Sequence, residues 1–324
     1  MSEMIQNIAL AAAAAAERIA GQIERTELRR SEAFSTNLLA NIFFKLENLQ
    51  TTGSFKLRGA TNRLMTLTEE EKAKGCVTAS SGNHAVATAC AMQKLGLSGV
   101  IFVPEQTSSV KVDKIRSYGG DVQFFGTDGL DTEQHARQYA EDNGMFYVSP
   151  YNDEQVIAGQ GTCGIEMLEQ YPEIDTVLIA VGGGGLIGGV GSVLKAHNSD
   201  IKVYGCQPKA SAVMALSIAE GELLDMPSEP TLSDGTAGGI EPGAITFALN
   251  QAAVDEFIIV SEKEITEAMR LYVNTEGHTI EGAAGVAVAS LLAIKDEIIG
   301  RNVVVVICGG NIADDKIAAI MGKF

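Results

Sequence analysis

Solidly apolar runs of three to five residues alternate along the chain with stretches that have helical spacing of apolar positions. Several runs lack the apolar-polar alternation of a half-exposed strand, as expected for parallel strands that are covered on both faces. The pattern therefore predicts an α/β protein with doubly wound, mostly parallel sheets. The predicted strands are residues 42–46, 76–78, 99–103, 121–125, 177–181, 202–204, 257–260 and 303–307.

Residues 75–145 form a block of successive strand-helix units, with helices predicted over 85–95, 110–118 and 132–143. Such a block is large enough for one small lobe. We therefore predict a small domain at 75–145 and a large domain that combines 1–74 with 146–324. Ligands of open α/β sheets bind beyond the carboxyl ends of the strands, so we expect the site in a cleft between two such lobes.

Composition narrows the range of partners. With 46% hydrophobic and 20% charged residues the chain is globular, and its net charge of −17 opposes binding to nucleic acid or to an anionic membrane. Five scattered cysteines without a C-x-x-C pair indicate reduced thiols, a cytoplasmic location and no zinc site. The alanine run at 11–16 is interrupted by Glu17 and Arg18, so it predicts an amphipathic first helix rather than a signal peptide or a membrane span.

Four consecutive glycines, Gly182, Gly183, Gly184 and Gly185, follow the apolar run at 177–181. Backbone amides converge on an anion where no Cβ blocks its approach, and the following helix adds its positive end, so the loop predicts a phosphate site. Tight strand-helix packing is the alternative explanation. The spacing also matches G-x-G-x-x-G, but the next strand ends in Gln207 instead of the carboxylate that a nicotinamide dinucleotide site requires.

Lys56 follows a loop and begins a predicted helix, next to Phe55. A helix N-terminus and partial burial both disfavour an ammonium ion, so we expect a lowered pKa for this lysine, as an imine-forming amine needs. An ordinary surface lysine is the alternative.

Two more loops carry polar groups at strand ends. Ser80, Ser81, Gly82, Asn83 and His84 precede the helix at 85–95, where Ser, Gly and Asn are first of all capping residues. Their amides and hydroxyls would also suit a second anion, such as a substrate carboxylate. Cys308 ends the strand at 303–307 before two glycines, where a cysteine is commonly core filling.

Six ordered segments together resemble the fold-type II pyridoxal-phosphate enzymes, with the nearest similarity to threonine/serine dehydratases and serine racemases. The segments are 54–59, 80–84, 156–162, 182–186, 281–285 and 308–311. The resemblance implies pyridoxal 5′-phosphate as cofactor. It also implies a site role for each matching residue: Lys56 as Schiff-base lysine and base, Phe55 beside the ring, Asn83 on the ring hydroxyl, Gly182 to Gly185 and Leu186 on the phosphate, Cys308 facing the ring nitrogen, and 80–84 on the substrate.

By this resemblance the chain is an ammonia-lyase that eliminates water from a β-hydroxy amino acid such as L-threonine or L-serine, giving a 2-oxo acid and ammonia. Ser81 matches the serine that acts as acid and base in racemases, so serine racemisation is an alternative, as is a bulkier or acidic substrate. An NAD(P)-binding oxidoreductase is a more distant one. The resemblance further implies a homo-oligomer, a dimer or a tetramer.

Several positions depart from the racemase pattern. Residues 207–213 lack the carboxylates of a divalent-cation site, so we expect no metal there. The helix from Thr132 lacks the racemases' substrate arginine, and Tyr151 replaces an asparagine. Both differences favour a dehydratase. We also expect no regulatory extension after Phe324.

Overall fold

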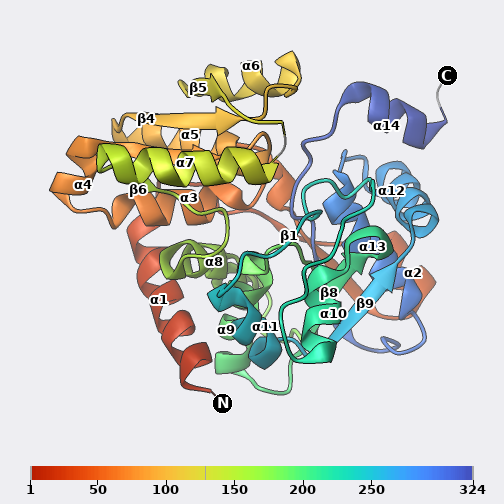
Figure 1. The fold of residues 1–324 in the computed structure, drawn as a ribbon. Helices are drawn as coiled ribbons and strands as arrows, with labels where there is room; N and C mark the ends of the chain where they lie inside the picture. The colour runs from red at the N-terminus through yellow and green to blue at the C-terminus, as the bar shows by residue number, and fades with distance from the viewer. Residues whose placement is uncertain (1, 128, 323–324) are drawn as a thin grey trace.

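Two separate sheets organise the computed structural model, which describes residues 2–127 and 129–322 (Figure 1). The larger has the order β1-β2-β10-β7-β8-β9, and the smaller has the order β5-β4-β3-β6. Every neighbouring pair is parallel except β1 with β2. The strands are β1 Leu28–Arg30, β2 Asn41–Lys45, β3 Cys76–Ala79, β4 Gly99–Val103, β5 Asp121–Phe124, β6 Phe146–Tyr147, β7 Thr176–Ala180, β8 Lys202–Pro208, β9 Glu256–Val260 and β10 Asn302–Val306.

Helices surround both sheets. In Figure 1 the smaller sheet lies at the top with α5, α6 and α7, and the larger sheet lies below with α8 to α11. The helices are α1 Glu3–Ile19, α2 Glu32–Leu38, α3 Lys56–Met65, α4 Glu69–Lys74, α5 Asn83–Leu95, α6 Ser109–Ser117, α7 Gly129–Asn143, α8 Glu154–Gln170, α9 Gly185–His197, α10 Val213–Glu220, α11 Ile245–Ala253, α12 Glu262–Glu276, α13 Gly282–Ala293 and α14 Asp314–Met321, with the short 3₁₀ turns η1 Glu47–Leu49 and η2 Lys209–Ser211.

The eight predicted strands and the α/β class are confirmed, with strand ends shifted by a few residues at most. Solidly apolar strands lie inside the sheets: β7 is buried throughout, and β10 is buried from Val303 to Val306. The strands β1 and β6 were not predicted, because runs of three and two residues are too short to show a periodicity. The strands of the smaller sheet come from residues 76–147, and the domain boundaries at 74/75 and 145/146 stay a prediction.

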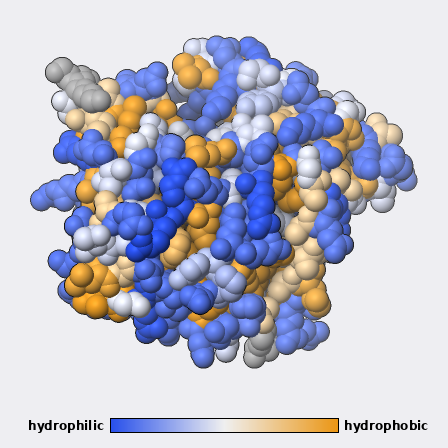
Figure 2. Space-filling view, turned by 180° about the vertical axis from the view of Figure 1, so that it is seen from behind, coloured by the Kyte–Doolittle hydropathy of each residue, from blue (hydrophilic) through white to orange (hydrophobic). Residues whose placement is uncertain are grey.

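The alanine-rich segment is an amphipathic helix, as predicted. Helix α1 begins after Ser2, whose side chain accepts a hydrogen bond from Ile5, and it buries Ile8, Ala12 and Ala15 against the rest of the protein. Among the described residues, no helix combines the length and the apolar character that crossing a membrane requires. The face in Figure 2 is largely hydrophilic, with hydrophobic residues in small separate patches. All five cysteines are buried and free.

A cluster of four charged side chains, of which three are buried and Glu166 is partly buried, anchors the start of α3. Arg58 is fully buried and donates to both carboxylate oxygens of Glu47, at 2.8 Å each, and to Glu166 at 2.7 and 2.8 Å. Lys45, also fully buried, donates to Glu166 at 2.6 Å. Burial alone would raise the pKa of Glu47, but Arg58 beside it holds that pKa below its usual value. Two cations and two carboxylates therefore balance within the core, where each would be costly alone.

We predict that Arg58→Met lowers the free energy of unfolding by about 3–5 kcal/mol, because Glu47 and Glu166 would then be buried with too few cations. Urea denaturation followed by circular dichroism measures the change. The matched control is Arg25→Met, which breaks a half-exposed pair with Glu169 and should leave the unfolding midpoint almost unchanged. Equal shifts in the two variants would contradict the account of this cluster.

Candidate active site

The segment before Lys56 is hydrogen-bonded to the segment after β10. Phe55 donates its backbone N–H to the Cys308 carbonyl at 3.1 Å, and Gly310 donates to Gly53 at 2.9 Å. Between them, Ser54 and Gly309 form an isolated antiparallel bridge. These bonds bring Lys56, the first residue of α3, beside Cys308, although 252 positions separate them in the sequence.

The Lys56 amine lies in a partly buried position. Its Nζ donates to the carbonyl of Pro150 at 2.7 Å and lies 5.2 Å from the centre of the Phe55 ring. Burial lowers the pKa of Lys56 to about 8, while Cys308 and Glu281 act in the opposite direction. The predicted lowering is confirmed, with desolvation as its cause. At mildly alkaline pH this amine is neutral and nucleophilic.

The four glycines form the loop from β7 to α9, as predicted, and Gly184 is the N-cap of α9 with a φ of +85°. A Cβ at Gly184 would lie 1.9 Å from the amide nitrogen of Asn250, and one at Gly183 would lie 2.4 Å from the Tyr151 ring. Only glycine fits this conformation and this spacing.

The glycine loop leaves backbone donors unpaired. No group among residues 2–127 and 129–322 accepts a hydrogen bond from the N–H groups of Gly183 to Ile187, although residues 184–187 are buried. Within the same part of the chain, the buried amide of Asn250 also has no partner. Unpaired donors at a helix N-terminus fit a phosphate, which satisfies them together and interacts favourably with the helix dipole.

A second uncapped helix end lies after β3. Gly82 is the N-cap of α5 without a side-chain cap, because Ser80 accepts the N–H of Gly82 at 3.1 Å instead of capping the helix. The N–H groups of Ser81, Asn83 and His84 find no acceptor within the described chain. The His84 ring is buried and bonds the Val148 carbonyl at 3.0 Å; burial lowers its pKa to about 3, so the ring is neutral. This loop can therefore offer backbone donors to an anion, while the His84 side chain is already engaged.

Asn83 lies in a network that sequence reasoning did not foresee. Its Nδ2 donates to both oxygens of Glu281 at 3.0 Å, and its Oδ1 accepts from Asn311 at 2.6 Å. From the sequence, Glu281 was named only as part of the segment 281–285, without a role of its own. The feature of the sequence that could have indicated a role for Glu281 is its place directly before Gly282, the glycine that begins α13. Burial raises the pKa of the Cys308 thiol well above its usual value, so this thiol is neutral.

Tyr151 connects Lys56 with the glycine loop. It follows Pro150, its ring packs on Gly183, and its hydroxyl accepts the N–H of Glu241 at 2.9 Å. Glu241 in turn pairs with Arg137 of α7 at 2.6 Å. The loop at 234–239, which sequence reasoning could not place, lies beside the glycines, since a Cβ on Gly182 would lie 3.0 Å from the Cα of Thr236.

The side chain of Gln207 forms hydrogen bonds with backbone groups of the protein. It begins the segment where we expected no cation site. Its Nε2 donates to Val181 at 3.0 Å and its Oε1 accepts from Ala215 at 2.7 Å. No cluster of three or more metal-ligating side chains occurs among the described residues.

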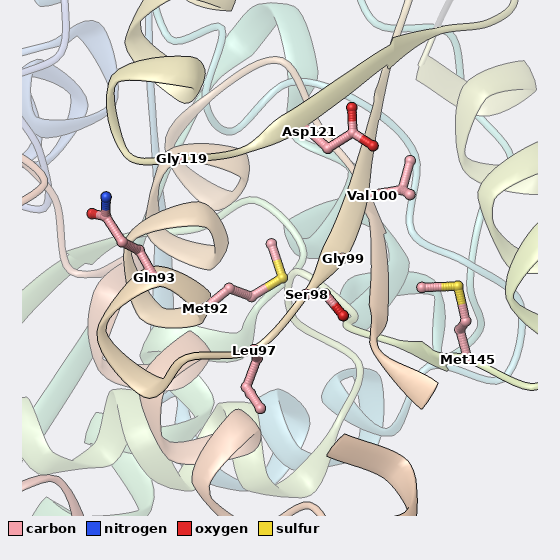
Figure 3. A pocket seen from close by; sticks show the side chains of 9 residues that line it. All are labelled: Met92, Gln93, Leu97, Ser98, Gly99, Val100, Gly119, Asp121 and Met145. Atoms are coloured by element: carbon pink, nitrogen blue, oxygen red, sulfur yellow. The ribbon is translucent and has the colours of Figure 1, made fainter. Parts of the chain in front are cut away.

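A pocket shown in Figure 3 lies elsewhere, at the amino ends of the smaller sheet. Gly99 and Asp121 begin β4 and β5, and Met92 and Met145 line the same hollow. None of the predicted site residues lines it. The predicted site lies instead at the carboxyl ends of β3, β7 and β10, where α/β proteins bind their ligands. There the chain brings together Lys56, the four glycines and the Ser80–His84 loop.

These features define an α/β protein in which a lysine of lowered pKa and a glycine loop with unpaired amides belong to one candidate site. Residues 19–309 match the family model described as "Pyridoxal-phosphate dependent enzyme". The chain therefore belongs to the family of pyridoxal-phosphate-dependent enzymes, and pyridoxal phosphate is its cofactor, in place of the dinucleotide that the glycine spacing also allowed.

Similar proteins indicate which members of that family this chain resembles. The chain is 39% identical to the catabolic L-threonine dehydratase of Escherichia coli strain K12, over 95% of this chain and 94% of that protein. It resembles the processed threonine deaminase isoform 2 of Solanum lycopersicum with a TM-score of 0.93 and 32% identity, over 100% and 94% of the two chains. Maize serine racemase superposes with a TM-score of 0.89 and 32% identity, over 97% and 98%.

We predict that Gly184→Ala destabilises the protein and abolishes its affinity for inorganic phosphate, because the methyl group meets both an unfavourable φ and the Asn250 amide. Gly221→Ala is the matched control: its φ is +84°, and nothing lies within 4 Å of its Cβ. This control should lose only about 1–2 kcal/mol of unfolding free energy, from the backbone conformation alone. Phosphate affinity is measured by calorimetry and unfolding free energy by urea denaturation. Equal losses of affinity and of unfolding free energy in the two variants would refute the close packing around Gly184.

Proposed function

We propose that this protein is a pyridoxal-phosphate-dependent ammonia-lyase that converts L-threonine or L-serine into the corresponding 2-oxo acid and ammonia. The observation that carries the proposal is the partly buried Lys56 amine, with a pKa of about 8, in the same site as a glycine loop whose amides find no acceptor within the described chain. The dehydratase and deaminase named above support the choice of reaction.

Pyridoxal phosphate supplies one kind of chemistry when bound, the withdrawal of electrons from the Cα of an amino acid, which acidifies the Cα proton. Lys56 would hold the cofactor covalently and, once the substrate amine has displaced it, would accept that proton as a neutral amine. The Pro150 carbonyl orients Nζ through its 2.7 Å hydrogen bond. The Cα proton and the β-hydroxyl are lost together as the elements of one water, and the unsaturated amino acid that remains takes up one water to give the 2-oxo acid and ammonia.

The two uncapped helix ends bind the two anions. Gly182 to Gly185 and Leu186, at the start of α9, hold the cofactor phosphate. Ser80, Ser81 and Gly82, with the backbone amides of Asn83 and His84, hold the substrate carboxylate at the start of α5. Burial and the dipole of each helix strengthen these contacts relative to water.

Three side chains would hold the cofactor ring. Phe55 would lie beside it, Asn83 would bond its hydroxyl, and the Cys308 thiol would be the partner of its nitrogen. A buried thiol with a raised pKa is neutral, so the ring nitrogen is not held protonated. A ring with weaker electron withdrawal suits elimination, because negative charge on Cα is relieved as the hydroxyl leaves.

Serine racemisation is the second candidate activity. Ser81 lies on the β3–α5 loop, and a hydroxyl there would protonate Cα from the face opposite Lys56. Resemblance to maize serine racemase supports this alternative. The family resemblance further leads us to propose a cytoplasmic homodimer or homotetramer.

We predict that Lys56→Ala lowers 2-oxo acid formation from L-threonine by at least about a thousandfold, because it removes both the attachment point and the base. Absorbance of the 2-oxo acid hydrazone and ammonia release measure the rate. Lys111→Ala, on the exposed first turn of α6, should retain wild-type activity. Full activity in Lys56→Ala would refute the proposed function.

With L-serine as substrate, we predict that pyruvate forms at least about ten times faster than D-serine, a difference of about 1.4 kcal/mol between the two barriers. Chiral chromatography of the amino acids alongside a pyruvate assay gives both rates from one reaction. Ser81→Ala should remove any D-serine formation while pyruvate formation continues. D-serine as the main product would assign the protein to the racemases instead.

A further inference from the structure

We propose that Glu281 is a positioning residue: its carboxylate fixes the amide of Asn83 at the Lys56 site, so that a proton on Glu281 releases Asn83 and weakens cofactor binding. The inference rests on the proposed function, because the contact of Asn83 with the ring hydroxyl belongs to it.

Glu281 is almost fully buried, with 6% of its surface exposed. It is the N-cap residue of α13, yet its side chain does not cap that helix. The carboxylate instead accepts both bonds from Asn83 Nδ2 at 3.0 Å and the backbone N–H of Asn311 at 3.2 Å. A Cβ on Gly309 would lie 2.6 Å from this carboxylate, so glycine leaves the room for it beside Cys308.

The partners of the Glu281 carboxylate are all N–H donors, so the hydrogen-bond network depends on whether Glu281 carries a proton. A carboxylate accepts from every N–H around it, whereas a carboxylic acid places an O–H opposite an N–H and loses an acceptor. Asn311 cannot compensate, since its Nδ2 already donates to Asn83 Oδ1 and to the Thr52 carbonyl, at 2.6 and 3.0 Å. The orientation of the Asn83 amide therefore depends on the charge of Glu281.

Charged and titratable groups face Glu281 from four segments. Lys56 comes from α3, Lys114 from α6, Asp234 from the loop before α11, and Cys308 follows β10. Lys114 also hydrogen-bonds the Asn311 side chain. Burial, the largest cause, and Asp234 raise the pKa of Glu281, whereas the Asn83 and Asn311 bonds and Lys114 lower it; the net pKa is about 7. The carboxylate is therefore present above about pH 7 and is lost as the pH falls below it.

The first test is binding of 4′-deoxypyridoxine 5′-phosphate, which lacks the aldehyde and so cannot react with Lys56. We expect Glu281→Gln to bind this probe about tenfold more weakly than wild type at pH 8, consistent with the loss of one hydrogen bond to a charged group. At pH 6, where wild-type Glu281 is protonated, the two proteins should bind within about twofold. Ionisation of the probe's phosphate affects both proteins alike and cancels in the ratio.

A second variant shows whether Glu281 acts through Asn83. In an Asn83→Ala background, Glu281→Gln should change probe binding by less than about twofold, because the side chain that it positions is already absent. A further tenfold loss in the double variant would contradict a positioning role.

Difference infrared spectroscopy of the protein without cofactor follows the carboxyl proton directly. We expect a titration with a midpoint near pH 7 that is missing in Glu281→Gln. Lys114→Gln should raise this midpoint and Asp234→Asn should lower it, while Lys111→Gln, on the exposed side of α6, should leave it unchanged.

The outcomes separate the two proposals. If wild type binds pyridoxal phosphate and the probe but Glu281→Gln binds the probe equally well at pH 8, the positioning role is overturned and the proposed function stands. If wild type fails to bind pyridoxal phosphate at any pH, the proposed function falls and the role of Glu281 falls with it.

Discussion

The site depends on the removal of one lysine amine from water. Lys56 begins α3 at a point where the segment before it is hydrogen-bonded to the segment after β10, so its backbone has a fixed place beside Cys308. Desolvation lowers its pKa, and the Pro150 carbonyl is its hydrogen-bond acceptor. The buried cluster around Arg58, two residues further along α3, holds the same helix in the core. A charge-balanced core thus supports a site whose lysine is readily neutral.

In the proposed site, backbone groups rather than cationic side chains supply the contacts to anions. The chain carries a charge of −17, and two sets of N–H groups that find no acceptor in the described part of the chain lie at the starts of α5 and α9. Amides at a helix end bind an anion without adding a mobile cation that would compete with Lys56 for the same partner. Glycine at positions 183 and 184 is required by the neighbouring Tyr151 and Asn250 side chains as much as by the ligand.

The sequence predicted the parts of the fold that leave a local signal. Long buried strands such as β7 and β10 show as unbroken apolar runs, and four glycines directly after such a run indicate a strand-to-helix loop. The position of Lys56 at a helix start was also readable. The strands β1 and β6 were missed, because they are too short to have a period and are held by pairing with longer neighbours.

Contacts between distant segments left no such signal. The bonds between Asn83 and Glu281 and between Glu241 and Tyr151 join residues 198 and 90 positions apart, so no spacing within one segment could predict them. The capping expectation for Ser80 was local and only partly held: the serine bonds the turn at Gly82 and leaves the helix end open.

The most direct test of the account is to reduce the protein–cofactor complex with borohydride and to locate the phosphopyridoxyl group by peptide mass spectrometry. The account predicts that the label lies on Lys56 and that its extent rises as the pH passes about 8, where this amine becomes neutral. A label on another lysine, or labelling that rises only near the pKa of about 10.4 of a solvated lysine, would contradict it.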